Sequence, residues 1–470
     1  MRLAAADQWR PQPGTLIDWT PTASTLAAAA QAPPHPTGPS FLQRDHILGV
    51  LAARAAGNTH RGYTCAAVTV DEDLDVTRMS RALTDFIRAH DNLRSRFRVE
   101  GTSIHRYLVS AEAIELAPTP GPPNTAPLDH LHHRLPHTAV FDAFPAVTFG
   151  AVTRPGSFDL YYAMDHAFGD GSAQILGLTE IIARYRGTID ELLNGTEPAG
   201  HLAYVDAEYA RAAAMTTDDH AVGVWRNALT ATGGVQPFPL PLGVDDGPAP
   251  VHIHSGNIAD SAATDRLAQL ARATGAGFTA ALHAALAATD KRLAGRDTYC
   301  TATVLSTRGT GEYRWSQGWF CNFAPIKFAV DGHRITDLLP AAAEAVEAAR
   351  QITHDPVHGA LGVLMASGDL DPSAMAGSPQ MVNYLDLRWF PPPADTRDLI
   401  VFTGEGRTRN ASMWITRDHD GLHLALQRPD NRIAAQSVSR YIAALRETIA
   451  TDTITADTPV TAAAPASEAV

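Results

Sequence analysis

The sequence predicts an α+β fold with mixed α/β layers, arranged as two domains. The chain has 470 residues, more than one hydrophobic core usually organises. Strand-like segments rich in β-branched and apolar residues alternate with segments of helical periodicity, and several strand pairs carry hairpin signals. We find no internal repeat in this alternation. The pattern therefore predicts layered sheets and helices in each half of the chain.

The composition is that of an ordinary globular protein, with 45% hydrophobic and 19% charged residues. A formal net charge of -13 and the lack of a basic stripe argue against a nucleic-acid partner. The three cysteines are far apart without zinc-ligand spacing, so we expect neither a disulfide framework nor a metal. The sequence shows no secretory signal and no bilayer-spanning apolar window, which predicts a cytoplasmic protein.

The first half is expected to hold an irregular N-terminal arm over residues 1–40 and a subdomain over 41–195. The Ala- and Pro-rich run 27–40 has polyproline II character. A short helix at 41–50 leads into the subdomain. Its other predicted elements are a strand at 63–70, a helix after the acidic residues 71–75, a hairpin through 107–109, strands at 146–153 and 158–164, and a helix that ends near Arg186.

The second half is expected to begin after a crossover over residues 196–250, whose Pro- and Gly-rich end marks the domain boundary. A second subdomain follows over 251–454. Residues 455–470 read as a disordered Ala/Thr/Pro tail. The predicted elements are helices at 260–273, 278–293, 337–353 and 437–450, strands at 298–305 and 382–389, and a hairpin about 418–421.

The candidate catalytic residue is His166. An aromatic, apolar run from Tyr161 ends at this histidine, and Asp170-Gly171 open the next predicted helix. The pattern places an imidazole at the end of a buried strand, where a substrate can reach it. An unperturbed pKa near ~6.5 suits a general base at neutral pH. From this motif alone, a hydrogen-bonded core histidine is an equal alternative.

Five segments in this order resemble the condensation-domain-like acyltransferases, which share the chloramphenicol-acetyltransferase fold. The segments are His90–Phe97, His166–Gly171, Trp225-Arg226 with Leu229, Gly318–Asn322 followed by Pro325, and Asn383–Arg388. The last segment is similar to the stand-alone polyketide-associated acyltransferases of actinobacteria. The resemblance covers most of the chain. It implies two subdomains that form a V with an active-site tunnel between them.

The resemblance implies transfer of a fatty or polyketide acyl group from a coenzyme A or phosphopantetheinyl carrier-protein thioester. The acceptor would be a hydroxyl of a sugar, glycolipid or lipid alcohol, with His166 as general base. No serine or cysteine stands in a Gly-x-Ser-x-Gly context, so we expect no acyl-enzyme. We expect no tightly bound cofactor and a monomer. A polyketide synthase or acyl carrier protein and peripheral membrane contact are possible partners.

The resemblance also suggests roles for the residues around the histidine. Asp170 would hold the loop through an ion pair, for which Arg308 is the candidate. The N–H of Gly171 would contact the oxyanion or thioester, although plain turn geometry is an equal alternative. Asp165 stands where peptide-synthetase condensation domains usually have a second histidine, which favours hydroxyl acceptors. The candidate tunnel residues are Asp165, Trp319, Asn322, Asn383 and Tyr384.

Several alternatives stay open. Asn322 and Trp319 fit structural core positions equally well, and Asn383 and Tyr384 could hold a sheet edge. The histidines 130, 132, 133 and 137 lack carboxylate or cysteine spacing, so a solvated loop is favoured over a metal site. The alternative functions are an amide-forming condensation enzyme of nonribosomal peptide assembly and a non-catalytic domain that recruits a carrier protein.

Overall fold

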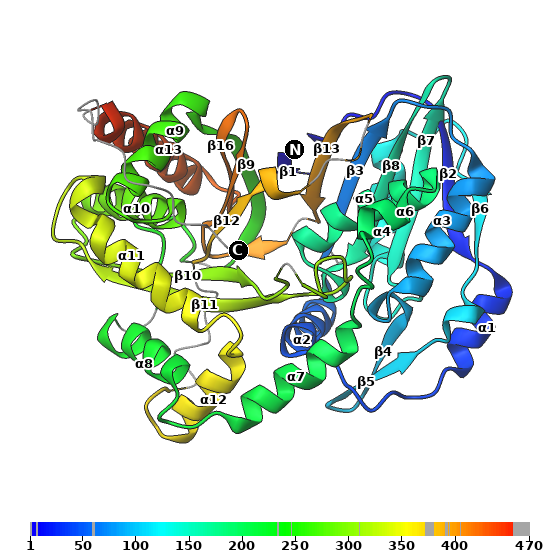
Figure 1. Ribbon diagram of the computed structural model, residues 1–470, viewed down its shortest axis with the longest axis horizontal. Helices are drawn as coiled ribbons and strands as arrows, with labels where there is room; N and C mark the ends of the chain where they lie inside the picture. The colour runs from blue at the N-terminus through cyan, green and yellow to red at the C-terminus, as the bar shows by residue number, and fades with distance from the viewer. Residues whose placement is uncertain are drawn as a thin grey trace. The chain divides into compact units, whose positions relative to one another are not determined.

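The computed structural model forms two compact units, drawn in Figure 1. The residues that the structure describes are 2–5, 8–58, 62–232, 235–245, 247–309, 311–371, 380–390, 393, 395–404 and 406–454. Unit 1 consists of Met1–Ala210, Arg308–Phe320 and Phe390–Glu405, and unit 2 of Arg211–Thr307, Cys321–Trp389 and Gly406–Val470.

A seven-stranded sheet organises unit 1, in the order β1-β13-β3-β8-β7-β2-β6. Its strands are β1 (Arg2–Ala5), β2 (Thr15–Pro21), β3 (Tyr63–Val70), β6 (Leu116–Pro120), β7 (Val147–Arg154), β8 (Ser157–Asp165) and β13 (Thr396–Thr403). Neighbours are antiparallel except β1 and β13. Every residue of β3 is buried, as is all of β8 after its first residue. The sheet therefore lies between two packed layers.

Successive residues of β8 point to opposite faces of the sheet. Tyr161 joins an apolar cluster with Trp9 and with Leu131 of α4 (Pro127–Thr138) on one face. Tyr162 contacts Phe86 of α3 (Val76–Ala89) on the other face, where α3 and α5 (Gly171–Arg186) lie side by side (Figure 1). Unit 1 also contains α1 (Ala23–Gln31), α2 (Phe41–Ala55), α6 (Ile189–Leu193), the first part of α7 (His201–Ala214) and the hairpin β4 (Ser95–Glu100) with β5 (Ser103–Leu108).

Unit 2 holds a five-stranded sheet in the order β12-β15-β16-β9-β14 and the antiparallel pair β10-β11. Its strands are β9 (Ala249–Asp260), β10 (Thr298–Ser306), β11 (Cys321–Ala329), β12 (Val382–Asp386), β14 (Arg407–Thr408), β15 (Ser412–Asp418) and β16 (Gly421–Pro429). Its helices after α7 are α8 (His220–Thr232), α9 (Ser261–Ala273), α10 (Phe278–Ala294), α11 (Ile335–Gln351), α12 (Val357–Ala366) and α13 (Arg432–Ile454). Helix α10 is buried from Ala280 to Asp290 because α9, α11 and α13 surround it.

The mixed α/β class is confirmed, but the predicted irregular arm is wrong. Residues 15–21 form β2, which lies between β7 and β6 in the sheet. Its Leu16 and Trp19 side chains are buried. Helix α1 follows with Thr22 as its N-cap. The strand was missed because it is defined by pairing with β7 and β6, which lie far along the chain, and the Ala- and Pro-rich composition of 27–40 obscured the end of the helix.

Two further differences concern the boundary of the second subdomain and the histidine-rich segment. Residues 308–320 and β13, expected in the second subdomain, belong to unit 1, where β13 pairs with β3. The four histidines that predicted a solvated loop lie in α4. His130 is buried beside Asp18, at 2.9 Å, whereas His132, His133 and His137 are exposed. The expected tail, 455–470, lies outside the described residues.

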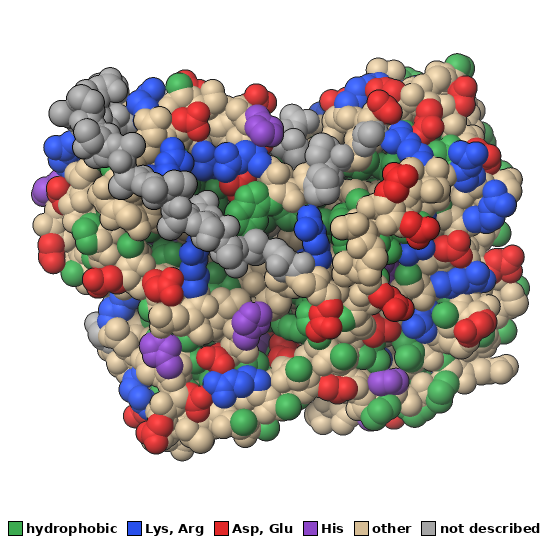
Figure 2. Space-filling view, in the orientation of Figure 1, with side chains coloured by type: hydrophobic (Ala, Val, Ile, Leu, Met, Phe, Trp, Pro, Cys, Tyr) green, Lys and Arg blue, Asp and Glu red, His purple; other side chains and the backbone are tan. Residues whose placement is uncertain are grey.

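Charged side chains do not gather by sign on the face drawn in Figure 2, where acidic and basic groups are interspersed over each unit. Among the described helices, none combines the length and apolar character that a bilayer-spanning segment requires.

Candidate active site

His166 follows β8 in a short 3-10 turn, His166–Phe168, and its ring is half-buried. Its backbone N–H donates to the carbonyl of Gly62 at 2.9 Å. The Asp165 carboxylate accepts from the N–H of Ala167 at 2.8 Å, across the histidine. The turn is thus tied to the strand that precedes it and to the segment before β3.

Two buried amides hold the far side of the turn. Gln43 Nε2 donates to the Ala167 carbonyl at 2.7 Å, and Asn92 Nδ2 donates to the Phe168 carbonyl at 2.9 Å. The fully buried Arg106 donates to Gln43 Oε1 at 2.8 Å. The segment 90–97 carries part of the family resemblance, but the sequence alone assigns none of its residues a role. Asn92 shows that this segment supports the turn that carries His166.

His46, on α2, is the site residue that the sequence analysis missed. Its Nε2 lies 2.9 Å from Oδ1 of Asp165, whose side chain is fully buried. His46 is three residues from Gln43, a spacing that places both on one helix face. Helix α2 therefore grips Asp165 through one side chain and Ala167 through the other. The only available signal was this spacing, which does not reveal what the face contacts.

Trp319 packs on His166, with ring centroids 4.2 Å apart and planes inclined by 34°. The His46 ring lies 6.0 Å from that of His166 and 6.1 Å from that of Trp319. Burial and the nearby His46 lower the pKa of His166 below 6.5, against the opposing effects of its backbone, Asp165 and Asp170. A lowered pKa leaves the imidazole neutral at pH 7, the form that can accept a proton.

Asp170 and Arg308 lie together, as the sequence analysis paired them. Nη2 of Arg308 is 3.3 Å from Oδ1 of Asp170, and both side chains are buried. Asp170 also accepts from the N–H of Ala173 at 2.7 Å, which caps α5, and from the N–H of Phe320 at 3.0 Å. Arg308 donates to the Tyr313 carbonyl at 3.1 Å. Asp170 therefore joins α5 to the segment 308–320 that carries Trp319.

The two glycines of the motif differ. A Cβ at Gly169 would lie 2.4 Å from Sδ of Met164, so close packing requires glycine there. A Cβ at Gly171 would meet no described atom within 4 Å, and Gly171 is exposed at the first position of α5. Packing among the described residues thus gives no reason for glycine at 171.

Asn322, Asn383 and Tyr384 belong to unit 2, where their polar groups have partners in that unit. The Asn322 side chain donates to the carbonyl of Asp355 at 2.7 Å and accepts from the N–H of Val357 at 3.0 Å, which fixes the turn before α12. Asn383 accepts from the N–H of Val304 at 3.0 Å. The ring of Tyr384 contacts that of Phe278, at 5.4 Å. These contacts account for the three residues structurally.

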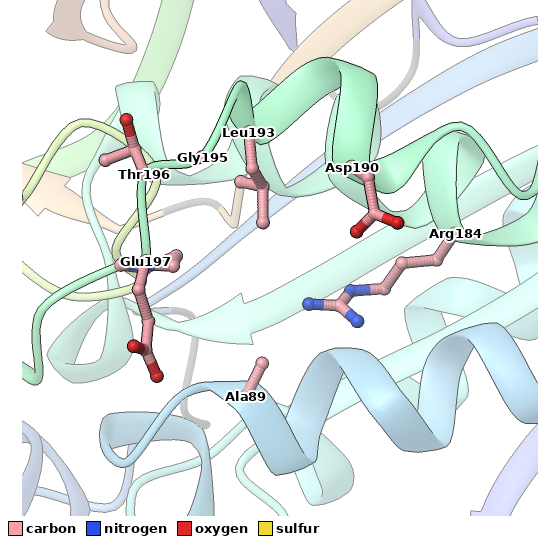
Figure 3. Close-up of a pocket in the computed structure, with 8 residues that line it drawn as sticks. Ala89, Arg184, Asp190, Leu193, Gly195, Thr196 and Glu197 are labelled. Carbon is pink, nitrogen blue, oxygen red and sulfur yellow. The ribbon is translucent and has the colours of Figure 1, made fainter.

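Figure 3 shows a hollow in unit 1 that none of the predicted site residues lines. Leu193 and Asp190 border it from α6, and Ala89 from the end of α3. Its arginine, Arg184, is 2.7 Å from Glu180, so its charge is compensated within the protein. Among the described residues, no cluster of histidine, cysteine and carboxylate side chains could hold a metal ion.

Comparisons with known proteins agree with the resemblance read from the motifs. The chain is 28% identical over 463 residues to the 2'-acyl-2-O-sulfo-trehalose (hydroxy)phthioceranyltransferase PapA1 of Mycobacterium tuberculosis, covering 95% of this chain and 88% of that one. It is 25% identical over 466 residues to acyltransferase PapA3 of the same species, covering 95% of each.

Solved structures with the same fold include a PapA2 acyl transferase, with a TM-score of 0.86 and 22% identity over 96% of this chain and all of that one. The X-domain from teicoplanin biosynthesis matches with a TM-score of 0.66 and 17% identity, covering 90% and 96%. The model of the condensation domain matches residues 49–357. With more than half of its length matched, this chain belongs to the condensation-domain family.

Proposed function

We propose that this protein is an O-acyltransferase in which His166 is the general base. The observation that carries the proposal is the fixed, half-buried imidazole of His166 against Trp319, with a pKa below 6.5. A neutral imidazole in a rigid turn can accept the proton of an acceptor hydroxyl without first losing its own. Relatives across nearly the whole chain carry acyltransferase names, which supports the reaction class.

In the proposed reaction, the acceptor oxygen attacks the carbonyl carbon of an acyl thioester. His166 takes the hydroxyl proton as the new C–O bond forms. The C–S bond then breaks, and the imidazolium returns the proton to the departing thiolate. Positioning both substrates can supply about 7–11 kcal/mol of the barrier, so no acyl-enzyme is required.

The donor would be coenzyme A or a carrier-protein thioester with a fatty or polyketide acyl group. The acceptor would be a hydroxyl of a sugar, glycolipid or lipid alcohol. The name of PapA1 specifies an acylated sulfo-trehalose, which supports a polyhydroxylated acceptor here. A polyketide synthase or acyl carrier protein is the proposed partner in the cytoplasm.

The test is to incubate the purified protein with acyl-CoA and a panel of polyols and amines. Thiol release and product mass are followed in parallel. We expect ester products, and we expect His166→Ala to lower turnover by about 10²- to 10⁴-fold, the usual contribution of a general base. His133→Ala, which removes an exposed histidine of α4, is the matched control. Undiminished turnover by His166→Ala would overturn the mechanism.

The same panel separates the alternatives that the condensation-domain match raises. Products formed only with amines would indicate an amide-forming enzyme. Carrier-protein binding without turnover on any acceptor would indicate a non-catalytic recruiting domain.

A further inference from the structure

We propose that His46 is a positioning residue for His166, which holds the His166 turn through Asp165 and balances the negative charge of that aspartate. The inference rests on the proposed role of His166 as a general base. It concerns a histidine that lies outside the His166–Gly171 motif, on a helix more than a hundred residues earlier in the chain.

The geometry supports the positioning part of the proposal. Oδ1 of Asp165 lies between His46 Nε2, at 2.9 Å, and the N–H of Ala167, at 2.8 Å. Asp165 and Ala167 are the two neighbours of His166 in sequence. A side chain that fixes Asp165 therefore fixes the backbone from which the imidazole projects. Gln43, on the same helix, holds the Ala167 carbonyl.

The burial of Asp165 supports the electrostatic part. The exposed fraction of its side chain is 0%, whereas that of His46 is 13%. A buried carboxylate needs a charged or hydrogen-bonding partner to remain ionised. His46 lowers the pKa of His166 and Asp165 raises it, so the fields of the two side chains oppose each other at the His166 imidazole.

Three other charged groups of the described residues, each acting on His166 or on Asp165, have partners of opposite charge. Asp170, which also acts on His166, pairs with Arg308. Arg54 of α2 and Asp142, which both act on Asp165, pair with each other at 2.8 Å. Each of these carboxylates is compensated by an arginine. Loss of the His46 charge would therefore remove the cation whose field opposes that of Asp165 at His166.

The deciding experiment measures the pKa of His166 by NMR on histidine-labelled full-length protein, with His166→Gln used to assign its signal. His46→Gln still offers Asp165 an N–H donor but removes the charge. We expect it to raise the pKa of His166 by about one unit, the scale of one nearby charge. The acid limb of kcat/KM should move upward equally, while the high-pH plateau is largely retained.

Two further variants separate charge from structure. In the double variant His46→Gln/Asp165→Asn, which removes both charges, the pKa of His166 should return toward the wild-type value. His133→Gln, which removes an exposed histidine of α4, should change neither the pKa nor the pH profile. A His46→Gln variant that lowers the rate equally at every pH, with the pKa of His166 unchanged, would overturn the electrostatic proposal.

If His46→Gln does not fold, Asp165→Asn replaces it. That variant should lower the pKa of His166, and an unchanged value overturns the proposal. The NMR measurement does not depend on turnover. Failure of the acyltransferase assignment would therefore appear in the substrate panel, and failure of the His46 proposal in the titration.

Discussion

Two buried aspartates flank His166, and basic side chains of different kinds contact them. Asp170 contacts Arg308, whose guanidinium carries several donors and reaches more than one acceptor. Asp165 contacts His46, a single imidazole on α2. Asp170 also caps α5 and accepts from the backbone of Phe320. The Asp170 side is thus a brace between α5 and the segment 308–320, whereas the Asp165 side ties α2 to the turn that carries His166.

Breaking the brace should have the largest effect on stability. Asp170→Asn leaves Arg308 as a buried charge without its carboxylate and weakens the cap of α5. Removal of one partner of a buried ion pair typically costs about 3–5 kcal/mol. We expect a loss of that size in the free energy of unfolding, measured by urea denaturation. The soluble yield should fall by at least as large a factor as the activity per folded molecule.

The control for this substitution is Asp190→Asn, because Asp190 is exposed on α6. Its free energy of unfolding should stay within about 0.5 kcal/mol of the wild type. An Asp170→Asn protein with wild-type stability and no activity would show instead that Asp170 acts in the chemistry. Asp170 would then have a role in the reaction and would not serve only as a structural contact.

The same contrast marks what the sequence could predict. The pair of Asp170 and Arg308 is predictable because Asp170 stands in the His166–Gly171 segment and the resemblance implies an arginine partner for it. His46 has no such signal, since its role depends on how α2 docks on the His166 turn. The apolar runs of β3 and β8 and the helical spacing of apolar residues in α3 predicted those elements, because a buried strand or helix face leaves a local pattern in the sequence.

Elements defined by distant pairing were not predictable in this way. Strand β13 completes the sheet of unit 1 from a position more than three hundred residues after β3. Asn322 was a candidate for the expected tunnel, yet its amide is satisfied by the backbone around the α11–α12 turn. A buried asparagine has the same sequence appearance in either role. Only its partners distinguish the two.

Trp319 lies between the Asp170–Arg308 contact and the Asp165–His46 contact. Its substitution is expected to have the next largest effect, on kcat/KM. It belongs to the segment that Asp170 and Arg308 hold, yet its ring packs on His166 and lies edge-on to His46. Trp319→Ala should lower kcat/KM by about tenfold to a hundredfold, because small misplacements of a reacting group are costly. Trp319→Phe keeps an aromatic surface and should lose less. Equal losses for both variants would count against the packing role, as measured by steady-state kinetics.

The smallest effect is expected at Gly171, just beyond the brace. A methyl group there meets no described atom within 4 Å, and alanine suits a helix better than glycine. Gly171→Ala should therefore leave the free energy of unfolding unchanged or raise it by up to about 1 kcal/mol. If the backbone at Gly171 approaches the thioester, the methyl should still lower kcat/KM severalfold, because it would keep the thioester from that close approach. Full activity in this variant would assign Gly171 to turn geometry alone, and a loss of both stability and activity would contradict the open space beside it.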